Sequence, residues 1–127
     1  MLGIDVVEVE RVVKANKNGA IEKKILTKQE KDYLLTKSTT VVNKFSERDY
    51  SLAGFWAAKE AVLKALELGI IVDLKQVEIC HKENGAPYVK LAKALLDMHK
   101  IDKSLKFELS TSHDAGVAVS VCNVAEI

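Results

Sequence analysis

The sequence predicts an α+β fold, in which a small antiparallel sheet packs with helices. One long stretch, 53–69, is rich in Ala, Leu, Lys and Glu, as helices are. In the last third of the chain, two pairs of strand-like segments are each joined by a short turn, as β-hairpins are. The predicted order is strand, several helices, hairpin, helix and hairpin, which favours an antiparallel sheet over a βαβ nucleotide-binding fold.

The composition is that of one globular domain spanning residues 1–127, with 48% hydrophobic and 29% charged residues. A chain of 127 residues buries a real core but is short for a large enclosed active site. If the chain is an enzyme, we therefore expect a neighbouring subunit to complete its site.

The compartment expected from the sequence is the cytoplasm. We expect no signal peptide, because Met1 leads directly into a strand that carries Asp5, and no apolar run has the length of a membrane span. Cys80 and Cys122 lie in strand-like segments without metal-ligand spacing, so we interpret them as buried free thiols.

The first predicted strand is 2–7, LGIDVV, in which alternate residues point to opposite faces. Leu2, Ile4 and Val6 form the face that we expect to be the apolar side. Asp5 then points away from that side, and an aspartate is disfavoured within a strand unless it has a specific role.

Three short helices are predicted next. Valines at a helical period mark the first from Glu8, and 16–19 ends it. A second is expected at about 21–26. Thr27 and Glu30 form a capping-box pattern for a third that runs to about residue 35. The polar and β-branched segment 36–50 has no clear period and is interpreted as a loop or lid.

The long helix is expected to end at Gly69, a favourable C-terminal residue. Four alanines spaced by four residues form a ridge that allows a close backbone approach. Glu60 and Lys64 lie one turn apart on a charged stripe headed by Trp56. A pair at this spacing is most often a solvated ion pair, so it does not establish chemistry alone. The apolar face gathers Phe55, Ala58, Val62, Ala65 and Leu66.

The remaining elements follow from turn signals and periodicity. A loop, 70–75, leads to a hairpin whose strands, 77–81 and 86–91, flank an Asn-Gly turn. A helix follows at about 91–98. Two final strands, about 106–112 and 117–124, are joined by residues 113–116.

The candidate chemistry lies in a few polar residues of different elements: Asp5, Glu60, Lys64 and His113. Two carboxylates from separate elements suit Mg²⁺, which takes one or two carboxylates and completes its shell with waters and phosphate oxygens. Zinc is disfavoured because the three histidines and two cysteines lack ligand spacing. His81 and His99 are interpreted as structural or exposed.

Residues 11–31 contain seven basic and two acidic side chains. Such a surface attracts an acidic partner, although a merely soluble lysine-rich surface is an equal alternative. Nucleic acid is disfavoured, since only Tyr33 lies nearby to stack on a base.

Five motifs, in this order, resemble those of the holo-acyl-carrier-protein synthases, the small phosphopantetheinyl transferases of bacteria. They cover nearly the whole chain, and their combination is specific where each alone is weak. The motifs are GIDVVEVERV at 3–12, KILTKQE at 24–30, AGFWAAKEAVLKAL at 53–66, NGAPYV at 84–89 and STSHDAGVAVSV at 110–121.

The resemblance implies a Mg²⁺-dependent transfer of 4'-phosphopantetheine from coenzyme A to a serine of apo acyl carrier protein, in fatty acid biosynthesis. It implies that Asp5 and Glu60 bind the metal. Lys64 is expected to reach the same phosphates as a point charge. Lys59 and His113 are further expected cofactor contacts, His113 near the 3'-phosphoadenosine end. The general base stays open among a metal-bound water, Asp5 and Glu60.

The resemblance also implies an acidic carrier protein as partner and a homotrimer with sites between subunits, without nucleic acid or a membrane. Arg11 is the expected carrier-protein contact, with Lys14 and Lys24 as further contacts. The alternative function is a non-catalytic trimeric module that binds acidic carrier proteins.

The sequence departs from the family pattern at Phe55, where the family usually has an arginine. If that arginine binds nucleotide phosphates, Lys44 or Arg48 is a candidate replacement. Phe55 also falls on the apolar face, where it is expected to belong to the core.

Overall fold

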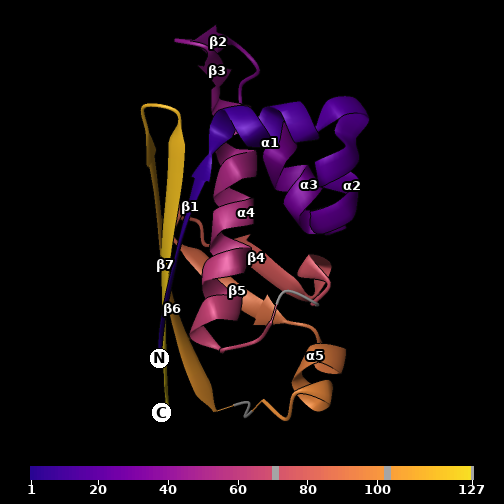
Figure 1. Ribbon diagram of the computed structural model, residues 1–127, viewed down its shortest axis with the longest axis vertical. Coiled ribbons are helices and arrows are strands. Elements are labelled where there is room, and N and C mark those ends of the chain that lie inside the picture. The colour runs from indigo at the N-terminus through magenta and orange to yellow at the C-terminus, as the bar shows by residue number, and fades with distance from the viewer. Residues whose placement is uncertain (70–71, 102–103, 127) are drawn as a thin grey trace.

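The computed structural model describes residues 1–69, 72–101 and 104–126 (Figure 1). Its helices are α1 Val9–Ala15, α2 Ala20–Ile25, α3 Lys28–Leu35, α4 Glu47–Ala65 and α5 Lys93–Met98. Its strands are β1 Leu2–Glu8, β2 Val41–Val42, β3 Phe45–Ser46, β4 Val77–His81, β5 Pro87–Leu91, β6 Leu105–Asp114 and β7 Val117–Glu126. The α+β prediction is confirmed. Of the predicted loop 70–75, Ile70 and Ile71 lie outside the described residues.

The main sheet is antiparallel, with strand order β1-β7-β6. The first strand of the chain, β1, pairs with the last, β7, so that Asp5 lies opposite Ser120 in β7. Strands β6 and β7 are longer than predicted and meet at Ala115 and Gly116, both with positive φ. Positive φ at both central residues is what a tight two-residue hairpin requires.

Helix α4 lies against this sheet, and helices α1–α3 gather on the side of α4 that faces away from the sheet (Figure 1). Helix α4 begins six residues earlier than predicted, because Ser46 and Asp49 form a capping box. The predicted loop 36–50 therefore holds the small β2–β3 hairpin and the first turn of α4.

The end of α4 also differs from the prediction, since Gly69 does not cap it. Glu67 takes the left-handed conformation (φ 58°). The N–H of Leu68 donates to the Leu63 carbonyl and that of Glu67 to the Lys64 carbonyl. These are the two hydrogen bonds of a Schellman motif, formed here without glycine.

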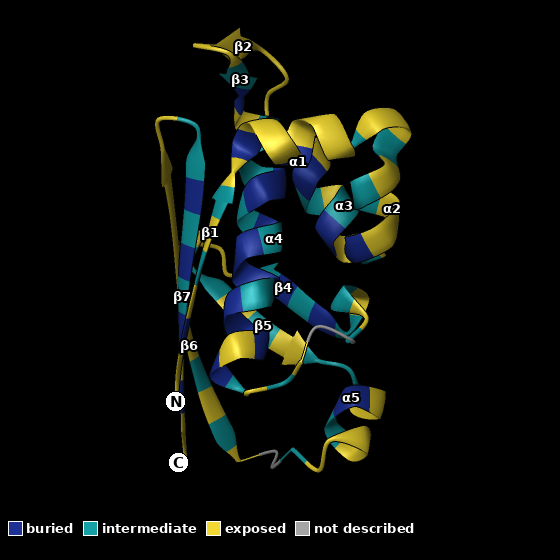
Figure 2. Cartoon of the chain, viewed as in Figure 1, coloured by how far each residue is buried: buried dark blue, intermediate teal, exposed yellow. Residues whose placement is uncertain are grey.

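Helix α4 is buried on most of its circumference (Figure 2). The predicted alanine ridge is confirmed, since Ala53, Ala57, Ala61 and Ala65 are all buried. It permits the close approach of β1: a Cβ atom added at Gly3 would collide with the Ala61 carbonyl oxygen.

Gly3→Ala is expected to destabilise the fold by about 3 kcal/mol, because β1 and α4 would have to separate. Gly54→Ala is the matched control: its new Cβ would make only ordinary contact with Thr111, 3.5 Å away, and alanine favours a helix by about 1 kcal/mol. Urea unfolding of both variants measures the difference, and equal effects would contradict the close-approach argument.

The predicted orientation of β1 is wrong. Leu2, Ile4 and Val6 are 70%, 59% and 62% exposed, whereas Gly3 is buried and Val7 packs against the core. The face that carries Asp5 is therefore the one that packs on α4. This orientation places Asp5 beside the charged stripe of the helix.

The smaller elements follow the prediction. The Thr27–Glu30 capping box is present at the start of α3. Strands β4 and β5 pair as a hairpin, and Gly85 in its turn has a φ of 88°. Both cysteines are free; Cys122 is buried as expected, whereas Cys80 is only half-buried, unlike the expectation.

Candidate functional site

Asp5, Glu60 and Lys64 meet where β1 crosses α4. The Lys64 Nζ donates to Asp5 Oδ1 at 3.0 Å and to the Ile4 carbonyl oxygen at 3.0 Å. The Asp5 side chain is only 14% exposed, whereas that of Lys64 is 54% exposed. Asp5 on β1 thus forms one cluster of charge with Glu60 and Lys64, which lie more than 50 positions later in the chain. Because the Lys64 side chain is half exposed, it can still reach a ligand.

Burial raises the pKa of the Glu60 carboxyl group, and the neighbouring negative charge of Asp5 raises it further, while Lys64 acts in the opposite direction. Two carboxylates that repel each other at a partly buried place favour a cation between them. A cation bound beside Asp5 and Glu60 would relieve this repulsion.

Because the pKa of Glu60 is raised in the folded protein, the folded state binds a proton at the Glu60 carboxyl group more tightly than the unfolded chain does. Its contribution to folding is therefore favourable in acid and is lost as the pH rises through the raised pKa. Without metal, Glu60→Gln is expected to unfold at a higher temperature than the wild type at pH 7 and to lose this advantage near pH 4. Thermal melts of both proteins at pH 7 and pH 4 test this, and the same difference in melting temperature at both pH values would contradict it.

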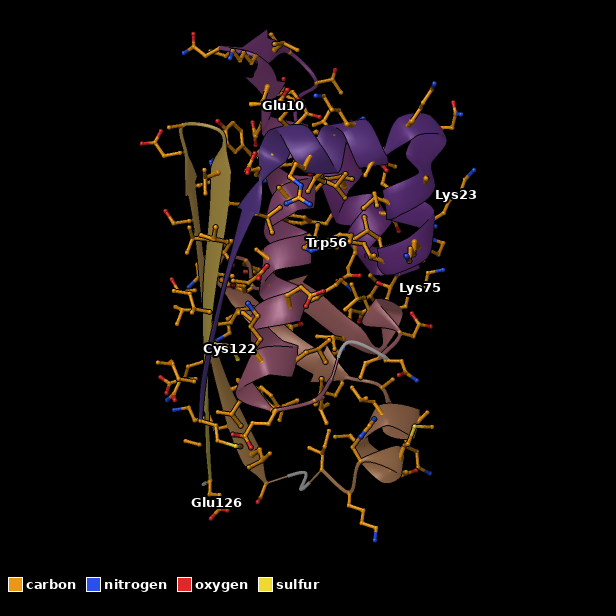
Figure 3. The ribbon with its side chains drawn as sticks, viewed as in Figure 1. Glu10, Lys23, Trp56, Lys75, Cys122 and Glu126 are labelled. Carbon is orange, nitrogen blue, oxygen red and sulfur yellow. The ribbon has the colours of Figure 1, made fainter. Side chains whose placement is uncertain are left out.

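Asp5 and Glu60 line one cleft of about 460 Å³, which we call the carboxylate cleft. Its walls come from β1, α1, the start of α2, and α4. Trp56 lies on the side of α4 that faces the helices α1–α3 (Figure 3). The lining residues are Asp5, Val6, Val7, Glu8, Arg11, Val12, Ala15, Ile21, Trp56 and Glu60.

The donor set fits Mg²⁺. Two carboxylates in an open cleft leave positions for water and phosphate oxygens, as this ion requires. Among the described residues no group of three His, Cys, Asp or Glu side chains is placed to hold an ion, which is the arrangement a structural zinc site needs.

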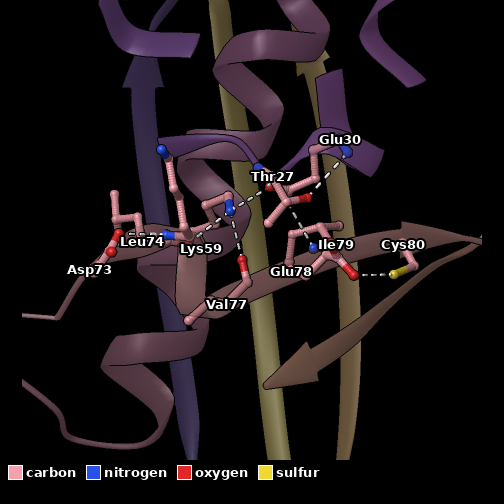
Figure 4. A network of polar contacts seen from close by, with 10 residues as sticks. Thr27, Glu30, Lys59, Asp73, Leu74, Val77, Glu78, Ile79 and Cys80 are labelled. Atoms are coloured by element: carbon pink, nitrogen blue, oxygen red, sulfur yellow. Dashed lines mark hydrogen bonds and ion pairs between the residues drawn. The ribbon is translucent and has the colours of Figure 1, made fainter. Parts of the chain in front are cut away.

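The expectation that Lys59 binds the cofactor is wrong. Its side chain is fully buried, and its Nζ donates to Glu30 Oε1 at 2.8 Å and to the carbonyl oxygens of Leu74 and Val77 at 2.9 and 2.7 Å (Figure 4). All three ammonium protons are thus used inside the protein. Burial lowers the pKa of Lys59, and Glu30 opposes this shift.

Glu30 completes this network, which the sequence did not reveal. One oxygen accepts from the Thr27 N–H and from Lys59, and the other accepts from the Ile79 N–H at 2.9 Å. The network joins α3, α4 and β4 (Figure 4). The only sequence signal at Glu30 is the Thr27–Glu30 capping box, which does not indicate that the glutamate is buried.

The three expected carrier-protein contacts are exposed. Arg11 lines the carboxylate cleft. Lys14 lies on the same helix and pairs with Glu10 at 3.1 Å. Lys24 lines a second cleft, which shares Trp56 and Glu60 with the carboxylate cleft. Their roles stay predictions.

His113 lies apart from Asp5 and Glu60, near the tip of the β6–β7 hairpin. Its ring stacks on Tyr50 with centroids 4.6 Å apart, and the Tyr50 hydroxyl accepts from the Gly116 N–H. Both rings line an open cleft of about 860 Å³ beside the β2–β3 hairpin, together with Lys44. Tyr50 is a further candidate ligand contact, and the sequence analysis did not single it out.

Phe55 belongs to the core, as expected from its helical face. It is 3% exposed and makes edge contacts with the rings of Tyr33 and His81. Arg48 donates to the carbonyl oxygens of Leu35 and Lys37, so it holds the preceding loop. Lys44 lines the cleft that contains His113, and it is thus the better placed of the two suggested replacements for the arginine.

Comparisons with known proteins identify the family of the chain. The family described as the 4'-phosphopantetheinyl transferase superfamily matches residues 1–122. The holo-(acyl-carrier-protein) synthase of Caldicellulosiruptor saccharolyticus is 37% identical over 98% of this chain and 94% of its own length. That of Nitratiruptor sp. is 40% identical over 95% of each chain.

A solved structure shows the same fold. The holo-(acyl-carrier-protein) synthase of Helicobacter pylori, in complex with coenzyme A, superposes with a TM-score of 0.79 at 30% identity, over 98% of this chain and 100% of the other. The chain belongs to the 4'-phosphopantetheinyl transferase superfamily, a class of enzymes. Within that class it falls among the holo-(acyl-carrier-protein) synthases.

Proposed function

We propose that this enzyme transfers 4'-phosphopantetheine from coenzyme A to a serine of apo acyl carrier protein, in the cytoplasm and for fatty acid biosynthesis. The observation that carries the proposal is the meeting of Asp5 and Glu60 at one cleft, with Lys64 donating to Asp5 at 3.0 Å. The names of the relatives and the coenzyme A complex of the Helicobacter pylori protein support it.

In the proposed reaction, the serine oxygen attacks the phosphorus next to pantetheine, and the bond from that phosphorus to the bridging oxygen breaks. The products are the holo carrier protein and adenosine 3',5'-bisphosphate, and the serine proton passes to a base. Magnesium, bound by Asp5 and Glu60, supplies charge neutralisation at the diphosphate. Lys64 places a second positive charge against the same oxygens.

Mass spectrometry of apo acyl carrier protein tests the proposal. Incubation with the enzyme, coenzyme A and Mg²⁺ is expected to add one phosphopantetheine group, and chelation of the metal is expected to prevent the addition. A carrier protein that binds the enzyme yet gains no mass would overturn the proposed reaction.

The proposed assembly is a homotrimer with sites between subunits. The outer face of the sheet supports it, because Leu2, Ile4 and Val6 form a row of exposed apolar side chains along β1. Two of them lie opposite Val121 and Val119 of β7, which extends the apolar surface. A surface of this kind is typical of a protein interface. Sedimentation equilibrium, with Ile4→Asp as the disrupting variant, measures the assembly.

Arg11→Glu is expected to raise the KM for acyl carrier protein by about tenfold, while it leaves the affinity for coenzyme A unchanged. The reason is that Arg11 lies exposed at the rim of the carboxylate cleft, on the basic helix α1. Lys106→Glu makes the same charge change on the exposed side of β6 and serves as the control. Equal losses for both substrates would contradict a carrier-protein contact at Arg11.

A further inference from the structure

The tip of the β6–β7 hairpin lies beside the start of α1, and the peptide groups of Gly116 join this tip to two helices (Figure 1). Gly116 is the second central residue of the turn, so neither its N–H nor its carbonyl oxygen is needed to pair β6 with β7. Its N–H donates to the Tyr50 hydroxyl of α4 at 2.7 Å. Its carbonyl oxygen accepts from the N–H of Val9, the first residue of α1, at 2.9 Å. One residue of the turn therefore links α4 to α1.

The hydrogen bond from Val9 to Gly116 takes the place of a side-chain cap at the start of α1. The first N–H groups of a helix have no partner within the helix and need one outside it. The N-cap residue, Glu8, makes no capping hydrogen bond through its side chain. The bond from Val9 instead continues the β1–β7 ladder one step beyond the pair of Glu8 with Val117. The start of α1 is thereby fixed to the hairpin tip.

The other end of α1 is held by local contacts. The Asn16 side chain accepts from the N–H groups of Ile21 and Glu22 and donates to the Glu22 carboxylate. These contacts reach at most six residues along the chain, and they tie α1 to α2. Of the two anchors of α1, only the one at Gly116 leads to Tyr50.

Tyr50 is well placed to hold the hairpin tip. Its half-buried ring stacks on His113 with centroids 4.6 Å apart and meets the ring of Phe45 edge-on at 5.9 Å. Contacts on two sides of the ring restrict the direction in which the hydroxyl points. A phenylalanine at this position would keep both ring contacts and lose only the hydrogen bond to Gly116.

We propose that Tyr50 is a positioning residue for the carrier protein. Its hydroxyl holds Gly116, Gly116 holds the first turn of α1, and α1 presents Arg11 at the rim of the carboxylate cleft. The inference rests on the proposed function, because it takes the carrier-protein contact at Arg11 from it. It gives a role in protein recognition to a residue on another helix, which is not among those that line the carboxylate cleft.

Amide hydrogen exchange of the free enzyme, measured by NMR, tests the link from Tyr50 to α1. In Tyr50→Phe the Gly116 N–H loses its partner, so the Val9 amide is expected to exchange about tenfold faster. The amide of Ala57, buried in α4, is the internal reference, because a general loss of stability would speed both amides alike. Tyr88→Phe removes the hydroxyl of a tyrosine that is 37% exposed on β5, and this matched control is expected to change neither rate. Exchange at Val9 that stays constant relative to Ala57 would overturn the inference.

Steady-state kinetics tests the effect on recognition. Tyr50→Phe is expected to raise the KM for apo acyl carrier protein about fivefold and the KM for coenzyme A by less than about twofold. In an Arg11→Ala background the same substitution is expected to leave the KM for the carrier protein unchanged, because its effect passes through Arg11. A rise in the KM for coenzyme A alone would instead make Tyr50 a direct cofactor contact. That result, or an undiminished effect in the Arg11→Ala background, would overturn the inference.

The same variants separate this inference from the proposed reaction. If the enzyme binds the carrier protein but transfers nothing, the proposed reaction is refuted. Calorimetric dissociation constants for apo acyl carrier protein and for coenzyme A then replace the two KM values, with the same expected changes. The exchange of the Val9 amide needs no substrate and is decisive in either case.

Discussion

Glu60→Gln and Asp5→Asn are each expected to lower kcat/KM for transfer by about a thousandfold, while the fold stays intact. The loss corresponds to about 4 kcal/mol of charge stabilisation at the transferring phosphoryl group. Each substitution removes one of the two anionic groups at the β1–α4 crossing and keeps its shape, so packing around the half-buried Glu60 is preserved. Steady-state turnover at saturating Mg²⁺ measures the loss.

Glu67→Gln provides the matched control, because it removes one negative charge from an exposed position just beyond the end of α4. It is expected to keep wild-type turnover. Folded Asp5→Asn or Glu60→Gln enzyme with near-normal activity would refute the assignment of these carboxylates. Raising the Mg²⁺ concentration is expected to recover part of the activity if a weakened metal site is the cause.

Lys59→Met is expected to lower the free energy of unfolding by about 3–5 kcal/mol, because it leaves the buried carboxylate of Glu30 without its charged partner. The carbonyl oxygens of Leu74 and Val77 lose a donor as well. Urea denaturation measures the effect. A loss of stability on this scale is a large part of what a domain of this size has in total.

Lys64→Met is the control for this second prediction, since Lys64 is 54% exposed and its ion pair is screened by solvent, so that it is worth no more than about 1 kcal/mol. The double variant Lys59→Met with Glu30→Gln removes both charges and is expected to be more stable than Lys59→Met alone. The full cycle, which adds the Glu30→Gln single variant and the wild type, gives the coupling energy of the pair. If Lys59→Met costs no more than Lys64→Met, the buried network is not what holds these elements together.

The elements with local signals could be predicted from the sequence. The Thr27–Glu30 capping box, the Asn84-Gly85 turn and the alanine ridge of α4 each depend on residues that are close in the chain. The start of α4 was missed although Ser46 and Asp49 carry a local signal. The usual capping box has glutamate or glutamine at the third helical position, whereas α4 has aspartate there.

Features that depend on distant contacts could not be predicted. Alternation in β1 shows two faces, but both carry apolar residues, so the pattern does not say which one packs on α4. The approach of Gly3 to Ala61 decides it. Likewise, the partner of Lys59 lies 29 residues away, and lysine is rarely buried unless it is paired.

For the candidate site, the family motifs predicted which charged residues gather, but not which side chains surround them. The meeting of Asp5 with Glu60 was expected from the family motifs, and both line one cleft. The direct contact of Lys64 with Asp5, at 3.0 Å, was not expected. The buried state of Lys59 and the second cleft beside Glu60 depend on how α2, α3 and β4 pack around α4. No periodicity in the sequence reports that packing.

The burial of α4 on most of its sides also determines how the molecule opens. Amide protons exchange with solvent through local openings of low free energy where the backbone has few buried contacts, and only through global unfolding where it has many. The amides of Ala57, Ala58 and Ala61 lie in the second group, on the same turns that carry Glu60. Glu60, one of the two proposed metal ligands, therefore sits on a part of the backbone that is expected to exchange slowly. Local opening is expected to be fastest in the short β2–β3 hairpin, where Val41 and Val42 are exposed.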